Sequence, residues 1–337
     1  MGYYTDISKQ DRIASYDFIE KFIEDNVADW SKWNVDIQTD DIEALFSERI
    51  SEMNNTEFEF LVLHSGYIPD YYDKDSSQET LYSKLVESLV CEWAKRIGFT
   101  ESHLQKQKSN KEDITIKVDN KVIVCDAKSF RLGRSQASPN VKDVIKKEAY
   151  STWLSAYDEE ARVGGLTTFP SMHDWKKGGA AYHYYTEGNP SIMILYYEQM
   201  AYMLHHNIDA AQVIDFLTSY NETFPEPSTD KSYYWKGIRD FLFNDDSYED
   251  YMEEVSDYAK EKVVHTIESL GKRVENIEQA VDKQISEMEI DDIKALAREA
   301  LVQIHTKELS TLKERVIEFR LSLFPKEDGL FEKKEED

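Results

Sequence analysis

Two segments in the middle of the chain carry acidic residues that can converge on one metal ion. Asp113 begins an alternating, β-branched segment, and Asp126 and Lys128 end a second segment that is uncharged over residues 122–125. Side chains at positions i and i+2 of a strand project from the same face, so Asp126 and Lys128 point together. The Asp-Asn pair at residues 119–120 is a turn sequence, which predicts a hairpin that brings Asp113 beside Asp126.

Two carboxylates and an ammonium group at one strand end suit a hard divalent cation such as Mg²⁺, which binds through one or two carboxylates and through phosphate oxygens. A metal held there can activate water and stabilise charge on a phosphate. Lys128 can position or help deprotonate the attacking water, or stabilise the charge that develops. The spacing alone is a weak signal, and an ordinary surface ion pair between Asp126 and Lys128 is the alternative. Asp126 follows directly from an apolar strand, however, where an unpartnered carboxylate is costly.

The segment after the second strand carries side chains suited to DNA. Arg131 and Arg134 supply planar guanidinium groups, which bind phosphates and guanine edges through two hydrogen bonds at once. Ser138, Asn140 and Lys142 add small polar or basic groups of the kind that contact bases and backbone. A solvated loop is the alternative interpretation of the same residues.

The charge of the chain is unevenly distributed. The net charge is −26, and residues 1–80 contain 6 basic and 19 acidic side chains, whereas residues 103–147 contain 11 basic and 5 acidic ones. A basic segment in an acidic chain predicts a localised anion-binding face, with chance clustering in surface loops as the alternative. The sequence has no Gly-rich phosphate-binding loop, which argues against a nucleotide cofactor.

Composition limits the class of protein. With 41% hydrophobic and 12% aromatic residues the chain can bury a large core, which excludes a disordered protein. Two cysteines are too few for a disulfide framework and indicate a reducing setting. The first twenty residues lack a signal-peptide pattern, and no uncharged apolar run is long enough to span a membrane. We therefore expect a cytoplasmic protein without a membrane partner.

Helices are expected ahead of the hairpin. Apolar residues three and four positions apart indicate helices within residues 1–60. A Pro-containing loop over 66–75 leads to Ser76 and Glu79, which have the spacing of a capping box and open a helix to about residue 97. Gly98 then supplies the helix stop.

Beyond the hairpin the sequence predicts a helix over about 140–157, loop-like chain over 160–190 and an apolar strand over 191–196. From about residue 248 to 319 the pattern is helical and rich in Glu and Lys, which fits two or three long antiparallel helices that can pack on a second subunit. The expected fold class is α/β, with a mixed central sheet flanked by helices and a helical C-terminal extension.

Two stretches resemble the HindIII-type restriction endonucleases: CDAKSFRLGR at 125–134 and GYIPDYYDKDSSQETLYSK at 66–84. The run DAKSFRL is specific, and a looser likeness extends from about residue 60 to 205. These enzymes are dimeric, Mg²⁺-dependent nucleases of the PD-(D/E)xK fold. The resemblance places Asp126 and Lys128 on the family's D-x-K and Asp113 on its upstream metal-binding Asp. It implies a metal site formed by Asp113, Asp126 and Ala127.

The resemblance leaves the other acidic residues open. The usual Pro before the upstream Asp is replaced by Glu112. Residues 105–108 read Gln-Lys-Gln-Lys and contain no acid, so Glu101 or Glu112 would have to stand in for a further carboxylate of that loop. Asp143 matches an auxiliary carboxylate. Helices ahead of such a core often contribute a Glu to the site, which makes Glu79 a catalytic candidate, although the capping box gives it a purely structural role.

The function implied by the resemblance is that of a type II restriction endonuclease. Such an enzyme cleaves double-stranded DNA at a short palindromic site as a homodimer, leaves 5′-phosphate and 3′-hydroxyl ends, and acts beside a cognate DNA methyltransferase. AAGCTT is a first guess for the target. The expected regions are an N-terminal helical region (1–65), a nuclease core with DNA-contacting loops (66–245), a long helical region with a possible role in dimerisation (246–325) and an acidic tail (326–337). A structure-selective or repair nuclease, a non-enzymatic DNA-binding protein and an acidic helical scaffold are the alternatives.

Overall fold

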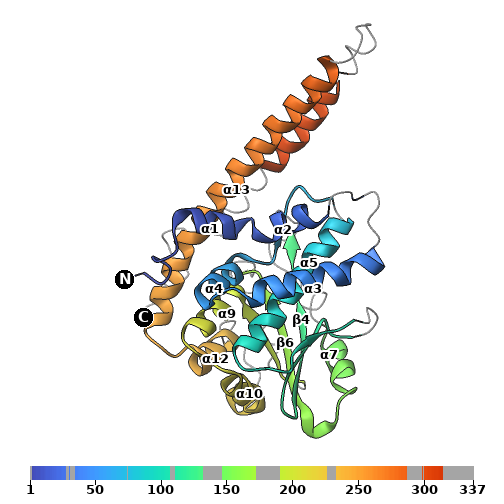
Figure 1. The fold of residues 1–337 in the computed structure, drawn as a ribbon. Coiled ribbons are helices and arrows are strands. Elements are labelled where there is room, and N and C mark those ends of the chain that lie inside the picture. The colour runs from blue at the N-terminus through green and yellow to red at the C-terminus, as the bar shows by residue number, and fades with distance from the viewer. Residues whose placement is uncertain are drawn as a thin grey trace.

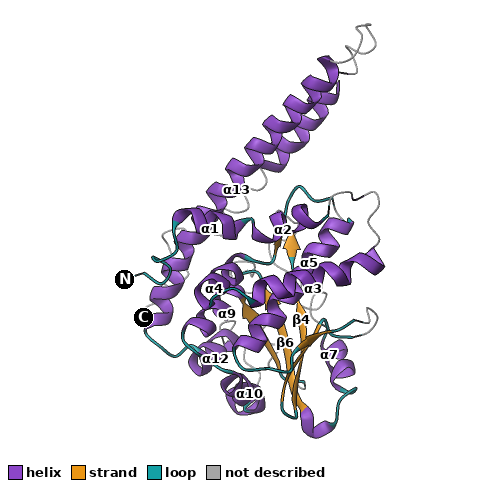
Figure 2. Ribbon diagram, viewed as in Figure 1, coloured by secondary structure: helices purple, strands orange, loops and turns teal. Residues whose placement is uncertain are grey.

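The structure is a computed structural model of the 337-residue chain, and it describes residues 2–27, 30, 35–73, 75–106, 111–131, 146–171, 190–225, 233–286, 298 and 300–313. A mixed five-stranded sheet lies at its centre, with helices on both faces (Figures 1 and 2). The strand order is β2–β3–β4–β6–β7. The strands are β2 (His103–Leu104), β3 (Ile114–Val118), β4 (Lys121–Ala127), β6 (Arg162–Phe169) and β7 (Ile192–Tyr196).

The predicted hairpin is confirmed. β3 and β4 are antiparallel, and their register runs from Val118 opposite Lys121 to Ile114 opposite Cys125. Asp119, the first residue of the two-residue turn, has a φ of 50°, a left-handed conformation that Asp tolerates better than most residues. β4 is also paired in parallel with β6, and β6 with β7. β4 is thus a central strand, as its uncharged middle predicted.

The prediction of a loop over 160–190 is wrong for its first part, because β6 occupies residues 162–169 within the sheet, between β4 and β7. Gly164 and Gly165 made the segment resemble a loop. In the sheet, however, each of them lets another part of the chain approach the strand closely. A Cβ on Gly165 would lie 2.3 Å from the ring of Tyr150, and one on Gly164 would lie 2.7 Å from the Ser191 carbonyl oxygen. The expected strand at 191–196 is confirmed as β7.

Helix α5 (Ser77–Arg96) begins and ends where the sequence predicts. The Ser76 side chain accepts a hydrogen bond from the Glu79 N–H at 3.2 Å, and Gly98 has a φ of 113° after the last turn. α5 contacts β3 and β4 on one face of the sheet. The expected N-terminal helices are α1 (Lys9–Tyr16), α2 (Phe18–Asn26), α3 (Val35–Ser51) and α4 (Asn55–His64).

Helix α7 (Lys147–Leu154) lies against the opposite face, where Tyr150 meets Gly165. It confirms part of the helix expected over 140–157, because residues 132–145 lie outside the described ranges. The other helical elements are a 3₁₀ turn (Glu159–Ala161), α9 (Tyr197–His205), α10 (Ala210–Thr218), α11 (Tyr220–Thr223), α12 (Tyr233–Leu242) and α13 (Ser247–Ser286).

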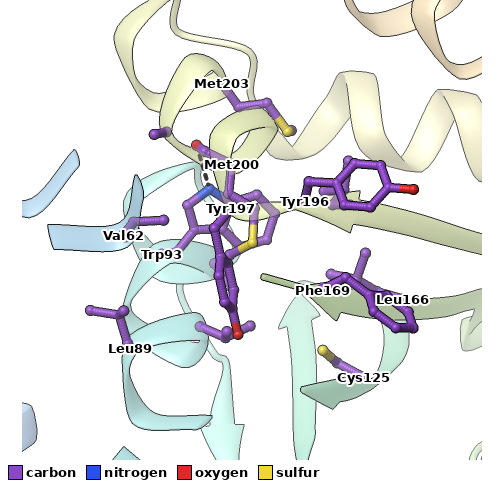
Figure 3. Packing of buried hydrophobic residues seen from close by; sticks show 14 of the residues in the cluster. Val62, Leu89, Trp93, Cys125, Leu166, Phe169, Tyr196, Tyr197, Met200 and Met203 are labelled. Atoms are coloured by element: carbon purple, nitrogen blue, oxygen red, sulfur yellow. Dashed lines mark hydrogen bonds between the residues drawn. The ribbon is translucent and has the colours of Figure 1, made fainter. Parts of the chain in front are cut away.

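The main core fills the space between α4, α5, α9 and the sheet (Figure 3). Trp93 of α5 is fully buried, and its Nε1–H donates to the Met200 carbonyl of α9 at 3.0 Å. Cys125 and Leu166 extend this core onto β4 and β6. The hydrogen bond satisfies the one polar atom of the tryptophan and fixes α5 against α9.

Helix α13 projects far beyond the body of the molecule (Figure 1). Residues 300–313 are helical and run antiparallel to it, because Asp282 pairs with Arg298 and Glu278 accepts from Thr306. The long antiparallel helices predicted for this region are confirmed, and we call this pair the arm. In the ranges that the structure describes, no helix has both the length and the apolar character needed to cross a bilayer.

A small second sheet joins the expected 66–75 loop to the chain that follows β4. β1 (Tyr67–Ile68) pairs in parallel with β5 (Phe130–Arg131). The Phe130 N–H also donates to the Gly66 carbonyl at 2.9 Å. This pairing fixes the chain that follows the end of β4.

Candidate active site

The hairpin register places Asp113 opposite Asp126. The register continues one position beyond the pair of Ile114 and Cys125, and the Asp113 N–H donates to the Cys125 carbonyl at 3.0 Å. The Asp113 side chain then reaches across to β4, where its Oδ2 accepts the Ala127 N–H at 3.0 Å. Asp113 and Asp126 also share a hydrogen bond between their side chains. The structure therefore brings together the two carboxylates that the sequence analysis singled out.

Lys128 joins them from the end of β4. Its Nζ lies 2.6 Å from Asp126 Oδ2, and its side chain remains more exposed than that of Asp126, at 26% against 11%. The Lys128 N–H donates to the Thr168 carbonyl of β6 at 3.1 Å, which anchors the main chain at this point. The ammonium group is thus held by a nearly buried carboxylate while it stays accessible to a substrate.

Glu87 of α5 is a third acidic residue at this place. Its side chain is buried, and both of its oxygens contact Lys84 Nζ, at 2.5 and 2.7 Å. Burial raises the pKa of Glu87 to about 7; Lys84 opposes this shift, whereas Glu43 and Asp126 add to it. At neutral pH this carboxyl group therefore lies close to the midpoint of its titration.

The pKa of Asp113 is raised further, to about 8. Burial is the largest cause, the negative charges of Glu87 and Asp126 follow, and Lys84 opposes them. The neighbouring carboxylates of α5 and β4 therefore disfavour the charged form of Asp113, which lies just before β3. A cation bound among them would remove that penalty, because a divalent ion becomes the largest local charge.

The acidic residues at this place suit a magnesium ion that takes only some of its ligands from the protein. Within the described ranges, no group of three or more His, Cys, Asp or Glu side chains is arranged to hold a metal by itself. The hydrogen-bonded pair of Asp113 and Asp126 supplies two hard oxygen ligands. Mg²⁺ commonly uses one or two carboxylates and completes its octahedron with water and substrate phosphate. The residues present fit that ion.

The structure places Glu79 at the start of α5, two turns before Glu87. Its Oε2 accepts the Asp75 N–H at 2.6 Å, and its own N–H is capped by Ser76. These contacts give it the structural role that the capping spacing indicated. Glu87, by contrast, is an acidic residue of this helix whose charge acts on Asp113.

Sequence reasoning missed Glu87, although a signal for it exists. The residue interrupts the apolar run LVESLV at 85–90, all of which is buried in the structure. A lone acidic residue on the apolar face of a helix needs a partner, and Lys84 stands three positions before it on the same face.

Glu112 and Glu101 have other partners. Glu112 is buried and accepts hydrogen bonds from the hydroxyl groups of Thr115 and Tyr157. Glu101 forms an ion pair with Lys117 at 2.5 Å. The described partners of both acids are therefore residues other than Asp113 and Asp126.

The proposed DNA-contacting residues are mostly outside the described ranges. The main chain of Arg131 belongs to β5 and pairs with Ile68. The other candidates follow β5 in the sequence and lie outside the described residues: Arg134, Ser138, Asn140, Lys142 and the proposed auxiliary carboxylate Asp143.

Comparison with known proteins agrees with this geometry. A family model for the HindIII restriction endonuclease matches residues 24–315, a range that contains α5, the hairpin, β6 and β7. The type II restriction enzyme HindIII of Haemophilus influenzae (strain ATCC 51907 / DSM 11121 / KW20 / Rd) is 23% identical over 265 residues, which cover 77% of this chain and 82% of that protein. The resemblance inferred from DAKSFRL is thereby confirmed. The chain belongs to the HindIII restriction endonuclease family, and it is a site-specific deoxyribonuclease with a restriction-endonuclease-like α/β fold.

Proposed function

We propose that this endonuclease is Mg²⁺-dependent and hydrolyses phosphodiester bonds of double-stranded DNA with Asp113, Asp126, Ala127 and Lys128. The observation that carries the proposal is the hairpin register, which sets Asp113 opposite Asp126 while Lys128 Nζ lies 2.6 Å from Asp126. Side-chain carboxylates, a main-chain carbonyl and an ammonium group meet at the end of one central strand. That combination matches metal-assisted attack on a phosphate better than any other chemistry available to these residues.

Asp113, Asp126 and the carbonyl of Ala127 would hold the ion. The N–H and C=O of one strand residue point toward the same neighbouring strand, so the Ala127 carbonyl faces the side on which Asp113 accepts its N–H. When bound, Mg²⁺ supplies Lewis-acid stabilisation of the charge that develops on the phosphate. Glu87, next to this pair, adds negative charge that strengthens the attraction for a cation.

Lys128 is the more exposed member of its pair with Asp126, and it would act on the DNA substrate. Asp126 orients the ammonium group, because its Oδ2 lies 2.6 Å from Lys128 Nζ. From this position Lys128 orients the attacking water or stabilises negative charge on the scissile phosphate. In-line attack with loss of the 3′ oxygen leaves a 5′-phosphate and a 3′-hydroxyl group.

We further propose a homodimer that binds a short palindromic site. A two-fold symmetric enzyme presents two identical sites to a two-fold symmetric sequence, and each subunit then cuts one strand. Arg131, Arg134, Ser138, Asn140 and Lys142 are the proposed DNA contacts, because they follow the catalytic strand directly in the sequence. A methyltransferase with the same specificity would protect the host DNA. Family membership supports this reading over a structure-selective nuclease or a non-enzymatic scaffold.

A plasmid digest tests the proposal. We expect discrete fragments with Mg²⁺ and none with EDTA, and end sequencing should give one palindromic site with 5′-phosphate termini. A smear would contradict sequence recognition, and fragments in EDTA would contradict the metal.

A further inference from the structure

Arg273 is one of several α13 residues that join the arm to the body of the enzyme, together with Glu261 on Arg12 and His265 on Asp17. The guanidinium carbon of Arg273 lies 3.5 Å from the ring centroid of Tyr71, and one of its nitrogens lies 2.5 Å from Glu24 of α2. A guanidinium group over an aromatic face is attracted by the ring quadrupole. Arg273 therefore holds the base of the arm to two separate segments of the body.

Tyr71 is fixed on its other side as well. Its hydroxyl group donates to Glu20 of α2 at 2.7 Å. The Tyr72 N–H donates to the Pro69 carbonyl at 3.1 Å, so the chain turns tightly here. The loop that follows β1 is thus clamped between α2 and α13, three residues after Ile68.

β1 supports the chain that leaves the catalytic strand. Ile68 pairs with Arg131 and Tyr67 with Phe130, two residues after Lys128. The Phe130 ring also stacks on Phe169 of β6 at 5.3 Å. The pairing with β1 and the contact with Phe169 together set the direction in which the chain leaves Lys128.

This pairing needs outside support. β1 and β5 comprise two residues each, and an isolated two-stranded pair of this length is not stable in water. β1 is held at its start by Gly66, which has a φ of 93° and leaves no room for a Cβ against Tyr197. At its end, Tyr72 packs edge-on against Tyr82 of α5, and Tyr71 is held by Glu20 and Arg273.

We propose that Arg273 is a positioning residue for DNA cleavage: it holds Tyr71 so that β1 stays paired with β5 and the chain after Lys128 keeps its direction. The arm is then a part of the catalytic machinery, although it lies away from the metal-binding carboxylates. A partner or DNA segment that moved the arm would change the activity through this contact.

The test compares Arg273→Ala with Arg239→Ala. The control is closely matched, because Arg239 of α12 forms an exposed pair with Glu249 of α13 at the same 2.5 Å. Arg273→Lys and Glu24→Gln separate the ring contact from the ion pair. Each variant is measured for single-turnover cleavage of plasmid DNA, DNA affinity with Ca²⁺, thermal unfolding and exchange of the Phe130 amide hydrogen.

Arg273→Ala should lower the single-turnover rate on the order of tenfold to a hundredfold, as expected when a reacting group shifts by about 1 Å. The Phe130 amide should exchange faster, and the unfolding midpoint should match that of Arg239→Ala. Arg273→Lys should restore part of the rate, and Glu24→Gln, which leaves Arg273 over the ring, should retain most of it.

Two results would overturn the proposal. One is an unchanged Phe130 exchange rate in Arg273→Ala, and the other is an equal loss of activity in Arg239→Ala. The exchange measurement needs neither metal nor DNA, so it stands even if the proposed metal site is wrong.

Discussion

Lys84 and Glu87 face each other one turn apart on α5, and Lys84 Nζ lies within 2.7 Å of both Glu87 carboxylate oxygens. The same ammonium group also opposes the rise in the pKa of Asp113 that burial and the neighbouring carboxylates cause. Lys84 therefore opposes the repulsion between Glu87 and Asp113. A divalent ion at this site would share that role.

Replacing Lys84 with Gln should destabilise the metal-free protein. The change leaves Glu87 buried without its cation, and breaking such a pair costs about 3 kcal/mol when both partners are largely shielded from water. Urea unfolding in EDTA at about pH 8 measures the loss. Lys260→Gln on α13 breaks an exposed pair with Asp257 and should leave the midpoint unchanged. Equal effects of the two changes would contradict the buried role of Lys84.

Asp126→Asn and Lys128→Ala should abolish cleavage without unfolding the protein. Each change removes a charge from the end of β4, where the register and the 2.6 Å contact bring these groups together. We expect the cleavage rate to fall on the order of a thousandfold or more. Circular dichroism and thermal unfolding check the fold.

The other end of the hairpin supplies matched controls for these variants. Asp119→Asn keeps a residue that tolerates the left-handed turn, and Lys121→Ala alters an exposed position of the same strand. Both should cleave at the wild-type rate. Near-normal cleavage by either active-site variant would show that the site lies elsewhere.

The metal-free protein should lose stability as the pH rises. Burial and neighbouring carboxylates raise the pKa of Asp113 from 3.8 to about 8, and burial raises that of Glu87 from 4.5 to about 7. Between the ordinary and the raised values the folded state binds more protons than the unfolded chain, so the free energy of unfolding falls with pH. Unfolding in EDTA between about pH 4 and pH 8 should follow this slope. Asp113→Asn should flatten it, whereas the exposed Asp257→Asn should not.

Mg²⁺ should reverse this loss at high pH. Its carboxylate ligands must be deprotonated, so binding is favoured where Asp113 has released its proton. The rise in unfolding midpoint on adding Mg²⁺ should be larger near pH 8 than near pH 5, and it should be absent in Asp113→Asn. A rise of the same size at both values would indicate binding at another site.

Gly165→Ala should destabilise the fold by about 1–3 kcal/mol, as overpacking does in a filled core. The added methyl group would lie 2.3 Å from the ring of Tyr150, which is fully buried on the face covered by α7. Gly271→Ala on α13 is the matched control, because the nearest atom to its Cβ is 3.7 Å away. It should be neutral or stabilising, since Ala favours a helix interior over Gly. Equal effects would show that β6 does not pack as described.

The sequence predicted the central geometry because it depends on local signals. A two-residue turn fixes the register of a hairpin, and this is enough to set Asp113 opposite Asp126. The Ser76 cap and Gly98 likewise fix both ends of α5. In these places the determining interactions lie within a few residues of each other in the chain.

The features that the sequence did not predict depend on contacts between residues that are distant in the chain. β6 contains Gly164 and Gly165, and only their neighbours in the fold reveal that these glycines make room in a sheet. The choice between Glu79 and Glu87 required knowledge of how α5 is turned toward Asp113. Spacing within the helix does not specify this rotation, because it is set by packing against the sheet.

The short turn at the tip of the hairpin makes the active site sensitive to chain length rather than to sequence. Residues 119 and 120 are exposed and lie six positions from Asp113 and Asp126 respectively. A single inserted residue that slipped the pairing would move Asp113 to the other side of the sheet, because side chains alternate along a strand. In a mutational library, exchanges to Asn or Gly at Asp119 and polar exchanges at residue 120 should survive selection for cleavage, while insertions and deletions disappear.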